Sequence, residues 1–199
     1  MADIRDSYCI PVENTYAGQL QGTDSVLKPI LKNFDLIIEL GYHWGGLTLW
    51  FEKNKKEGTK VIGYDITDTF REVPDSRGVD YRIGDVFTEK VQEEIKELIH
   101  QSKRALIFCD ALKGVEFNIY SKIIRPNDVI MVHDFIDDDE SEKEDYYSKI
   151  THPKNWFAGP AINLNSIRDL IKEQNLYGYY YTKFRNVIIG SFIKKEVEE

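Results

Sequence analysis

The feature that most constrains the fold of this chain is an alternation of short apolar runs with segments of helical period. The strands that this pattern predicts lie at residues 35–40, 60–65, 79–82, 104–110 and 128–133. Apolar side chains recur at helical spacing from Thr23 onward and in residues 45–56, 89–101 and 114–124. Such an alternation predicts βα units, and therefore a parallel sheet whose two faces are both covered by helices.

The C-terminal part of the chain follows a different pattern. Residues 164–174 predict a helix, and residues 177–183 and 187–193 predict two strands joined near Arg185 and Asn186. So short a connection implies an antiparallel pair. We therefore expect an α/β fold with a doubly wound, mostly parallel, seven-stranded Rossmann-like sheet that ends in an antiparallel hairpin. The 199 residues suit a single domain, with residues 1–22 irregular.

Charge and composition exclude several classes of protein. The formal charge is −8, from 26 Lys and Arg against 34 Asp and Glu, which argues against a non-specific nucleic-acid binder. Residues 137–145 alone carry seven acids and one base, so residues 135–160 are expected to form an acidic lid or acceptor region, with a solvated loop as the alternative. The longest apolar runs are too short to span a bilayer. Two unclustered cysteines, Cys9 and Cys109, favour a reducing, cytoplasmic location.

Acids and glycines follow the predicted strands at the edge where parallel sheets bind ligands. These positions are residues 39–46, Asp65, residues 84–85, residues 110–113 and residues 133–134. Gly41, Gly45 and Gly46 would let a ligand approach the backbone, although the dinucleotide fingerprint G-x-G-x-x-G is absent. Asp65 lies 24 residues after Gly41, where a carboxylate can accept both hydroxyls of a ribose. The alternative is an acid that ends a strand for local reasons.

Residues 35–46, DLIIELGYHWGG, closely resemble the first motif of the class I S-adenosylmethionine-dependent methyltransferases. The fit is best to the branch with the cephalosporin-hydroxylase-like and macrocin-type O-methyltransferases. Residues 108–113 and 125–134 resemble that branch and the catechol-type O-methyltransferases as well. The resemblance covers roughly residues 20–135. It implies that the cofactor is bound by Glu39, Gly41, Gly45, Gly46, Asp65, Asp85, Val86 and Asp110.

The same resemblance implies a catalytic set and a metal site. Lys113 occupies the place of the catalytic lysine of the catechol type, and Asp110 and His133 belong with it. Asp110, His133 and Asp134 would hold Mg²⁺ or Mn²⁺, whose preferences such ligands suit. The catechol type has a further acid where Leu112 stands and an asparagine where Phe135 stands, which leaves the need for a metal open.

The function that these residues favour is methyl transfer from S-adenosylmethionine to a hydroxyl group of a small-molecule acceptor, with or without a metal. A Rossmann-like enzyme of other chemistry is the first alternative: a nicotinamide-dependent reductase, or a non-methylating user of S-adenosylmethionine. The second is a non-catalytic binding protein on the same scaffold. No membrane partner is expected, and a homo-oligomer stays open.

Overall fold

In the computed structural model, the described residues are 9–20, 22–136, 162–185 and 187–197. Within them, the centre is a seven-stranded sheet in the order β10-β11-β7-β6-β3-β4-β5. The five strands from β3 to β7 are parallel, and β11 is antiparallel to both of its neighbours. The predicted α/β class is therefore confirmed. The strands are β3 Leu36–Leu40, β4 Lys60–Asp65, β5 Asp80–Ile83, β6 Ala105–Cys109, β7 Val129–Val132, β10 Leu176–Gly178 and β11 Gly190–Lys194.

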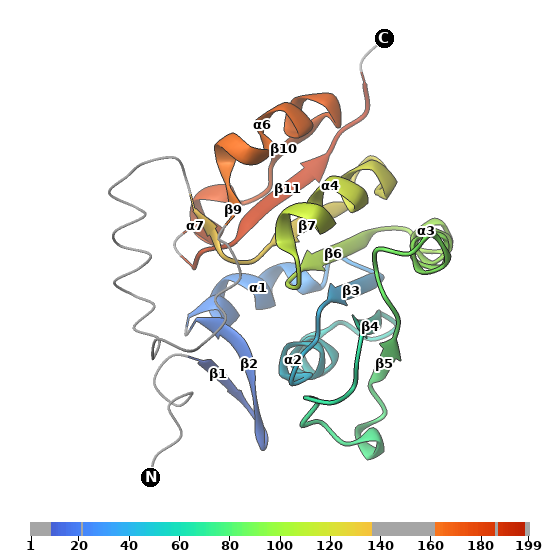
Figure 1. Ribbon diagram of the computed structural model, residues 1–199. Coiled ribbons are helices and arrows are strands. Elements are labelled where there is room, and N and C mark those ends of the chain that lie inside the picture. Colours follow the sequence, from blue (N-terminus) through green and yellow to red (C-terminus); the bar gives the residue numbers. More distant parts are fainter. Residues whose placement is uncertain (1–8, 21, 137–161, 186, 198–199) are drawn as a thin grey trace.

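Helices cover both faces of this sheet, as Figure 1 shows. One face carries α3 (Glu89–Gln101), α4 (Lys113–Ile123) and α6 (Leu164–Glu173), and the other α1 (Thr23–Leu31), α2 (Gly46–Asn54) and α7 (Tyr181–Arg185). Ile95 of α3 packs in one core with Ile38 and Ile107, while Phe51 of α2 packs in the other with Ile37. Because both faces are buried, the central strands are continuous apolar runs and not alternating ones.

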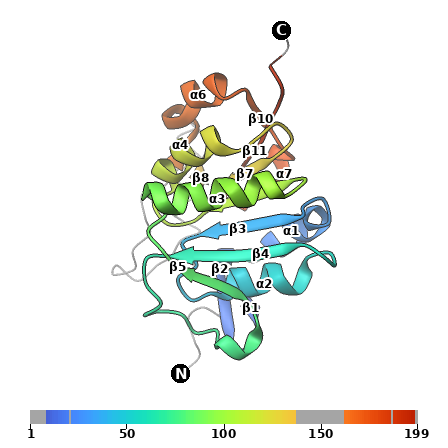
Figure 2. The ribbon, with the colours of Figure 1, turned by 90° about the vertical axis from the view of Figure 1, so that its right-hand side faces the viewer.

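The parallel strands bring their carboxyl ends to one edge of the sheet. Figure 2 shows β3, β4 and β5 running in the same direction, and β6 and β7 continue the parallel register. The acids that follow these strands therefore gather at that edge, as the sequence predicted. A short parallel pair extends it: β8 (Phe135–Ile136) with β9 (Ile162–Asn163).

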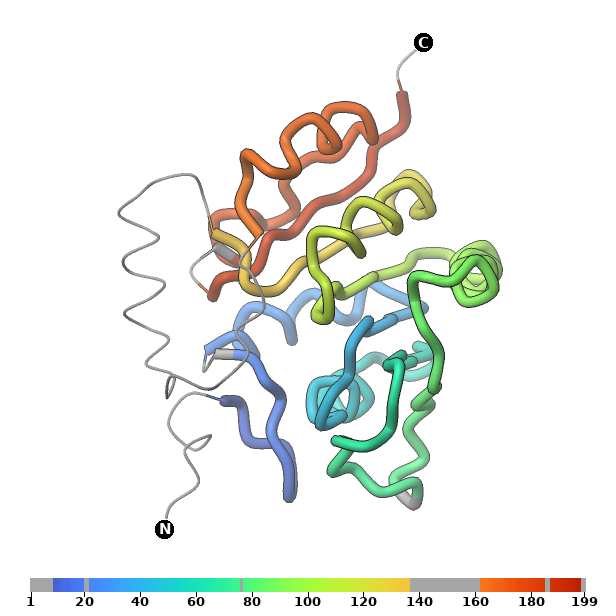
Figure 3. The backbone as a smooth tube through the Cα atoms, in the orientation of Figure 1, coloured from blue at the N-terminus to red at the C-terminus, as the bar shows by residue number. Residues whose placement is uncertain are grey.

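The prediction that residues 1–22 are irregular is wrong for residues 9–20. These residues form an antiparallel hairpin of β1 (Cys9–Val12) and β2 (Thr15–Leu20). Figure 3 shows it beside α2. Gly46, the first residue of α2, permits this contact, because a Cβ atom there would overlap the carbonyl oxygen of Tyr16.

The C-terminal antiparallel pair is confirmed, but its predicted tight turn is wrong. The helix α7 lies between β10 and β11, and the tyrosines from Tyr179 to Tyr181 are not strand residues. The helical turn buries Phe184 completely in the core. Of the acidic lid or acceptor region predicted at residues 135–160, residues 137–160 lie outside the described residues. Among those that are described, no helix is long and apolar enough to cross a membrane.

Candidate functional site

The glycine turn at the end of β3 is held from two sides. The Gly41 amide donates to the Tyr64 carbonyl at 2.7 Å, which ties the turn to β4. The backbone of Gly41 has a φ of 89°, and a Cβ atom there would lie 2.7 Å from the Cβ of Ala111. Gly45 has a φ of 81° and precedes α2, whose N-terminus has no side-chain cap. The turn therefore needs glycine for its conformation and for its close approach to Ala111.

Glu39 lies under this turn and is almost completely buried. Its carboxyl group accepts a hydrogen bond from the Thr48 hydroxyl, which joins β3 to α2. Burial raises the pKa of Glu39 well above its usual range, and the nearby charges of Asp110 and Asp65 act in the same direction. Burial therefore favours the protonated form of Glu39, and the side chain supports the turn from below.

Asp65 closes the turn from the neighbouring strand. Its carboxylate accepts the backbone N–H of His43 at 2.9 Å and that of Thr67 at 3.3 Å. Each carboxylate oxygen has two acceptor sites, so both can accept a further donor. Asp65 therefore has a local structural role and keeps the capacity to bind hydroxyl groups.

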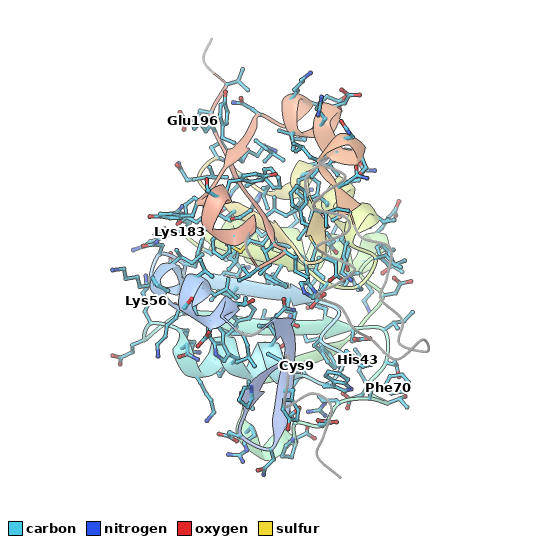
Figure 4. All side chains as sticks on the ribbon, turned by 90° about the vertical axis from the view of Figure 1, so that its left-hand side faces the viewer. Cys9, His43, Lys56, Phe70, Lys183 and Glu196 are labelled. Atoms are coloured by element: carbon cyan, nitrogen blue, oxygen red, sulfur yellow. The ribbon has the colours of Figure 1, made fainter. Side chains whose placement is uncertain are left out.

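Apolar side chains are exposed around the same edge. Ile66, which follows β4, is 69% exposed, and Ile83 at the end of β5 is 68% exposed. The ring of His43 lies 5.3 Å from that of Phe70, and Figure 4 shows the two side chains together. Exposed apolar residues next to strand-ending acids form a surface on which a planar ligand can stack.

The predicted pair at residues 85–86 has mainly structural contacts. The Asp85 carboxylate accepts the Phe87 amide at 2.9 Å. The Val86 side chain is buried, and its carbonyl accepts the Tyr120 hydroxyl at 2.7 Å. Asp85 is half-buried at the sheet edge, whereas Val86 could approach a ligand only through its backbone.

A polar cluster lies at the ends of β6 and β7; we call Gln19, Asp110, Lys113, His133 and Asp134 the strand-end cluster. His133 Nδ1 lies 2.8 Å from Asp110 Oδ1, and Gln19 Nε2 donates to Asp110 Oδ2 at 2.8 Å. Lys113 Nζ lies 2.7 Å from Asp134 Oδ2 and 3.9 Å from Asp110 Oδ1. Two carboxylates from neighbouring strands thus share a histidine and a lysine.

Two polar atoms of this cluster are buried without a hydrogen-bond partner among the described residues: His133 Nε2 and Gln19 Oε1. A carboxylate only accepts, so the proton of a neutral His133 is on Nδ1, which faces Asp110, and Nε2 carries the lone pair. Buried polar atoms in proteins are rarely left unpaired, and those that are often belong to a ligand site.

The carboxylates of Asp110 and Asp134 stabilise the protonated forms of both basic groups of the cluster. Burial alone would lower the pKa of Lys113, but Asp110 and Asp134 outweigh it and hold the pKa above its usual value. In His133, burial likewise lowers the pKa and the same two carboxylates raise it, with a net increase. Lys113 is therefore a stable cation at neutral pH.

Glu116 lies on α4 behind the cluster and is fully buried. Its Oε2 accepts the Ala111 amide at 3.2 Å, while its Oε1 has no partner among the described residues. Burial raises its pKa to about 8, and the charge of Asp110 adds to this. Glu116 is therefore mostly neutral at pH 7 and supports the loop that carries Asp110.

The side chains as they lie do not fit a divalent metal. Mg²⁺ and Mn²⁺ need several oxygen or nitrogen donors around one point. Here Asp134 forms an ion pair with the Lys113 ammonium, and Asp110 is hydrogen-bonded to His133, so neither carboxylate faces a shared point. Within the described part of the chain, no group of three or more His, Cys, Asp or Glu residues is able to hold a metal ion.

Comparison with solved structures supports the fold. The chain matches no protein-family model. An apo structure of CmcI superposes with a TM-score of 0.60 and 16% identity over 94% of this chain and 82% of that chain. A Mg-SAM structure of CmcI superposes with a TM-score of 0.56 and 16% identity, again over 94% of this chain and 82% of that chain. The O-methyltransferase from Bacillus cereus, in complex with SAH, superposes with a TM-score of 0.51 and 16% identity over 89% of this chain and 84% of that chain.

The chain has the class I methyltransferase fold. The resemblance predicted from residues 20–135 is thereby confirmed at the level of the fold. One curated relative, the ribosomal RNA large subunit methyltransferase E of Methanococcoides burtonii, is 30% identical over 90 residues. The match covers 45% of this chain, and it spans only 31% of that relative.

On this methyltransferase fold, the predicted residues form two neighbouring groups. Glu39, Gly41, Gly45 and Asp65 lie around the glycine turn. The strand-end cluster brings together Asp110, Lys113, His133 and Asp134. Gly41 joins the two groups through its contact with Ala111.

Sequence reasoning missed Gln19, Thr48 and Glu116. Gln19 comes from a hairpin that was expected to be irregular, and its contact with Asp110 spans 91 positions. Thr48 and Glu116 each stand on the buried face of a helix, where a polar residue among apolar ones was the available signal. Such a residue usually bonds to a partner that the sequence does not identify.

Proposed function

We propose that this protein is an S-adenosylmethionine-dependent methyltransferase that methylates a hydroxyl group of a small-molecule acceptor. One observation carries the proposal: a glycine turn closed by Asp65 lies beside a partly buried Asp110–His133 pair, whose Nε2 accepts no hydrogen bond among the described residues and lies 3.6 Å from Asp134 Oδ1. The first feature suits a nucleoside ligand and the second suits removal of a proton. Both lie at one edge of a fold that solved methyltransferases share.

The cofactor would lie along the glycine turn. We assign the ribose hydroxyls to Asp65, whose oxygens keep acceptor capacity, and the adenine to the surface of Ile66 and Ile83, near Asp85. The methionine part would pass Gly41 and Gly45. The unpaired Gln19 Oε1 is a suitable acceptor for its ammonium group.

The proposal also gives Glu39, Gly46 and Val86 their parts. Glu39 shapes the turn through Thr48 and does not need to touch the cofactor. Gly46 allows the hairpin to reach α2 and so brings Gln19 to the site. Val86 contributes its backbone, since its side chain is buried.

Bound S-adenosylmethionine supplies a methyl group on a sulfonium, which a hydroxyl oxygen can displace. The chain has to remove the hydroxyl proton and hold the oxygen in line. We assign proton removal to His133 Nε2, with Asp110 fixing the tautomer and stabilising the charged ring. Lys113, which the catechol-type resemblance suggests as the base, is a poor proton acceptor while its ammonium is paired with Asp134.

Binding measurements test the cofactor. Titration calorimetry with S-adenosylmethionine, S-adenosylhomocysteine and NADH should give heat with the first two and none with NADH. Asp65→Asn should abolish this binding in a folded protein, whereas Asp75→Asn, on an exposed acid, should bind as the wild type does. NADH binding without S-adenosylmethionine binding would favour a reductase, and binding of neither would favour a non-catalytic protein.

The acceptor is tested separately. Labelled methyl transfer should be compared between a panel of small hydroxylated molecules and RNA, because one relative is a ribosomal RNA methyltransferase. The net charge of −8 gives little attraction to a polyanion, so small acceptors are the expected substrates. Transfer to RNA alone would contradict the small-acceptor part of the proposal and leave the cofactor part standing.

A further inference from the structure

The strand-end cluster already contains a cation between its carboxylates. Lys113 is only 7% exposed, and Asp134 is buried beside it. The Lys113 ammonium pairs with Asp134 at 2.7 Å and reaches Asp110 at 3.9 Å. These two acids follow the neighbouring strands β6 and β7, and they are the residues expected to bind a metal.

The position of Lys113 on its helix makes this pairing informative. Lys113 is the first residue of α4, where the helix dipole disfavours a positive charge. A lysine is also rarely buried unless it is paired. The two carboxylates therefore stabilise the buried ammonium group of Lys113, and the helix dipole does not.

Backbone geometry also serves this contact. Asp134 has a φ of 53°, a left-handed conformation that is uncommon for residues other than glycine. It follows β7 at the point where its carboxylate meets Lys113. Such strained residues persist where the surrounding contacts determine them, and they gather at functional sites.

We propose that the Lys113 ammonium takes the position of a divalent metal, so that this site works with a built-in side-chain cation. The catalytic meaning of this inference rests on the proposed methyl transfer. An ammonium group has three N–H donors, and only the 2.7 Å contact with Asp134 is short enough to use one, since Asp110 lies 3.9 Å away, so N–H donors remain for a ligand. One of these donors would hold the acceptor oxygen after His133 has taken its proton, which is the task a metal would otherwise perform.

A metal and the ammonium would exclude each other. A divalent ion between Asp110 and Asp134 would lie within a few ångströms of Lys113, and like charges at that distance in a buried site repel strongly. Removal of the lysine charge should therefore open the site to a cation. The carboxylates of Asp110 and Asp134 and the imidazole of His133, which as they lie form no metal site, would then turn toward that cation.

The test is direct measurement of Mn²⁺ binding, by paramagnetic resonance and by calorimetry, on the full chain. The wild type and Lys113→Arg should leave Mn²⁺ free in solution. Lys113→Ala should bind one Mn²⁺ per chain, and the double variant with Asp134→Asn should lose it. Lys122→Ala, which removes an exposed lysine of the same helix, should behave as the wild type does.

Two results would overturn the inference. One is stoichiometric Mn²⁺ binding by the wild type that Asp134→Asn abolishes, a result that needs no lysine variant to fold. The other is a folded Lys113→Ala protein that binds no Mn²⁺. Calorimetry with S-adenosylmethionine keeps the two proposals apart. A wild-type protein that binds neither S-adenosylmethionine nor Mn²⁺ refutes the proposed function. A wild-type protein that binds both refutes only the proposal that Lys113 takes the place of the metal.

Discussion

Asp110 Oδ1 and His133 Nδ1 lie 2.8 Å apart and join the ends of two neighbouring parallel strands. The two residues are 23 positions apart in the chain, and the register of β6 with β7 brings them together. The pair orients the imidazole so that Nε2 is available to a ligand. It is the contact on which the proposed chemistry depends.

Substitution of His133 should therefore affect chemistry more than cofactor binding. His133→Gln should lower kcat by about 10²–10⁴-fold, the usual contribution of a general base. The dissociation constant for S-adenosylmethionine should stay nearly unchanged, since His133 is not assigned to the cofactor. Single-turnover methyl transfer and calorimetry measure the two effects. The control is His100→Gln, on the exposed side of α3. A His133→Gln protein with wild-type kcat would remove His133 from the mechanism.

Gln19 should have two roles, because its amide N–H holds Asp110 from the hairpin and its Oε1 is assigned to the ammonium group of the cofactor. Gln19→Leu leaves Asp110 Oδ2 without this donor and should cost about 1–3 kcal/mol in the free energy of unfolding. Gln19→Glu should be worse, since it places a second carboxylate against Asp110. Chemical denaturation measures stability, and kinetics should show a larger fall in kcat than in acceptor affinity.

The exposed Gln101→Leu is the matched control. If Gln19→Leu and Gln19→Glu proved equally stable, the hydrogen bond to Asp110 would not be the reason for the effect. A loss of stability with unchanged kcat and unchanged affinity for S-adenosylmethionine would leave Gln19 a purely structural residue.

The central part of the site could be predicted from the sequence because its determinants are local. Runs such as residues 105–109 are apolar at every position, which indicates burial on both faces and therefore a parallel sheet. In that arrangement, acids that follow strands meet at one edge. Asp65, Asp110 and Asp134 were placed correctly at that edge for this reason.

The remaining features depend on contacts between distant residues. The hairpin of β1 and β2 is short, and its packing on α2 depends on the missing side chain of Gly46. The tyrosines before Phe184 have high strand propensity, yet burial of Phe184 favours a helical turn. The pairing of Lys113 with Asp134 joins a helix start to a loop 21 positions later, which no local pattern indicates.

Gly46 gives a test of the hairpin contact. Gly46→Ala would place a Cβ atom on the Tyr16 carbonyl, so the backbone must move, and the free energy of unfolding should fall by about 1–3 kcal/mol. Gly114→Ala is the control, because a Cβ atom there meets nothing closer than Ile162 at 3.8 Å. Within α4, that change should stabilise the chain by about 0.5–1 kcal/mol. Thermal denaturation of both variants checks the opposite signs.

Glu116 predicts a pH dependence of stability. Its pKa is about 8 in the folded chain, against a usual value of 4.5. Between these pH values the folded protein keeps a proton that the unfolded chain has released, so a rise in pH favours unfolding. The part of the stability that depends on Glu116 is therefore present below about pH 4.5 and is lost as the pH rises toward 8, on the order of 5 kcal/mol in total.

Glu116→Gln removes this titration and keeps an oxygen that can accept the Ala111 amide. The variant should lose less stability than the wild type between pH 5 and pH 8, and it should be the more stable protein at about pH 8. Glu39 and His133, whose pKa values are also raised, affect both proteins alike, so the difference between the two profiles isolates Glu116. Urea denaturation across this range measures it, with the exposed Glu97→Gln as the control. Parallel profiles for Glu116→Gln and the wild type would show that this carboxyl is ionised in the folded protein, and its place behind the Asp110 loop would then need a different explanation.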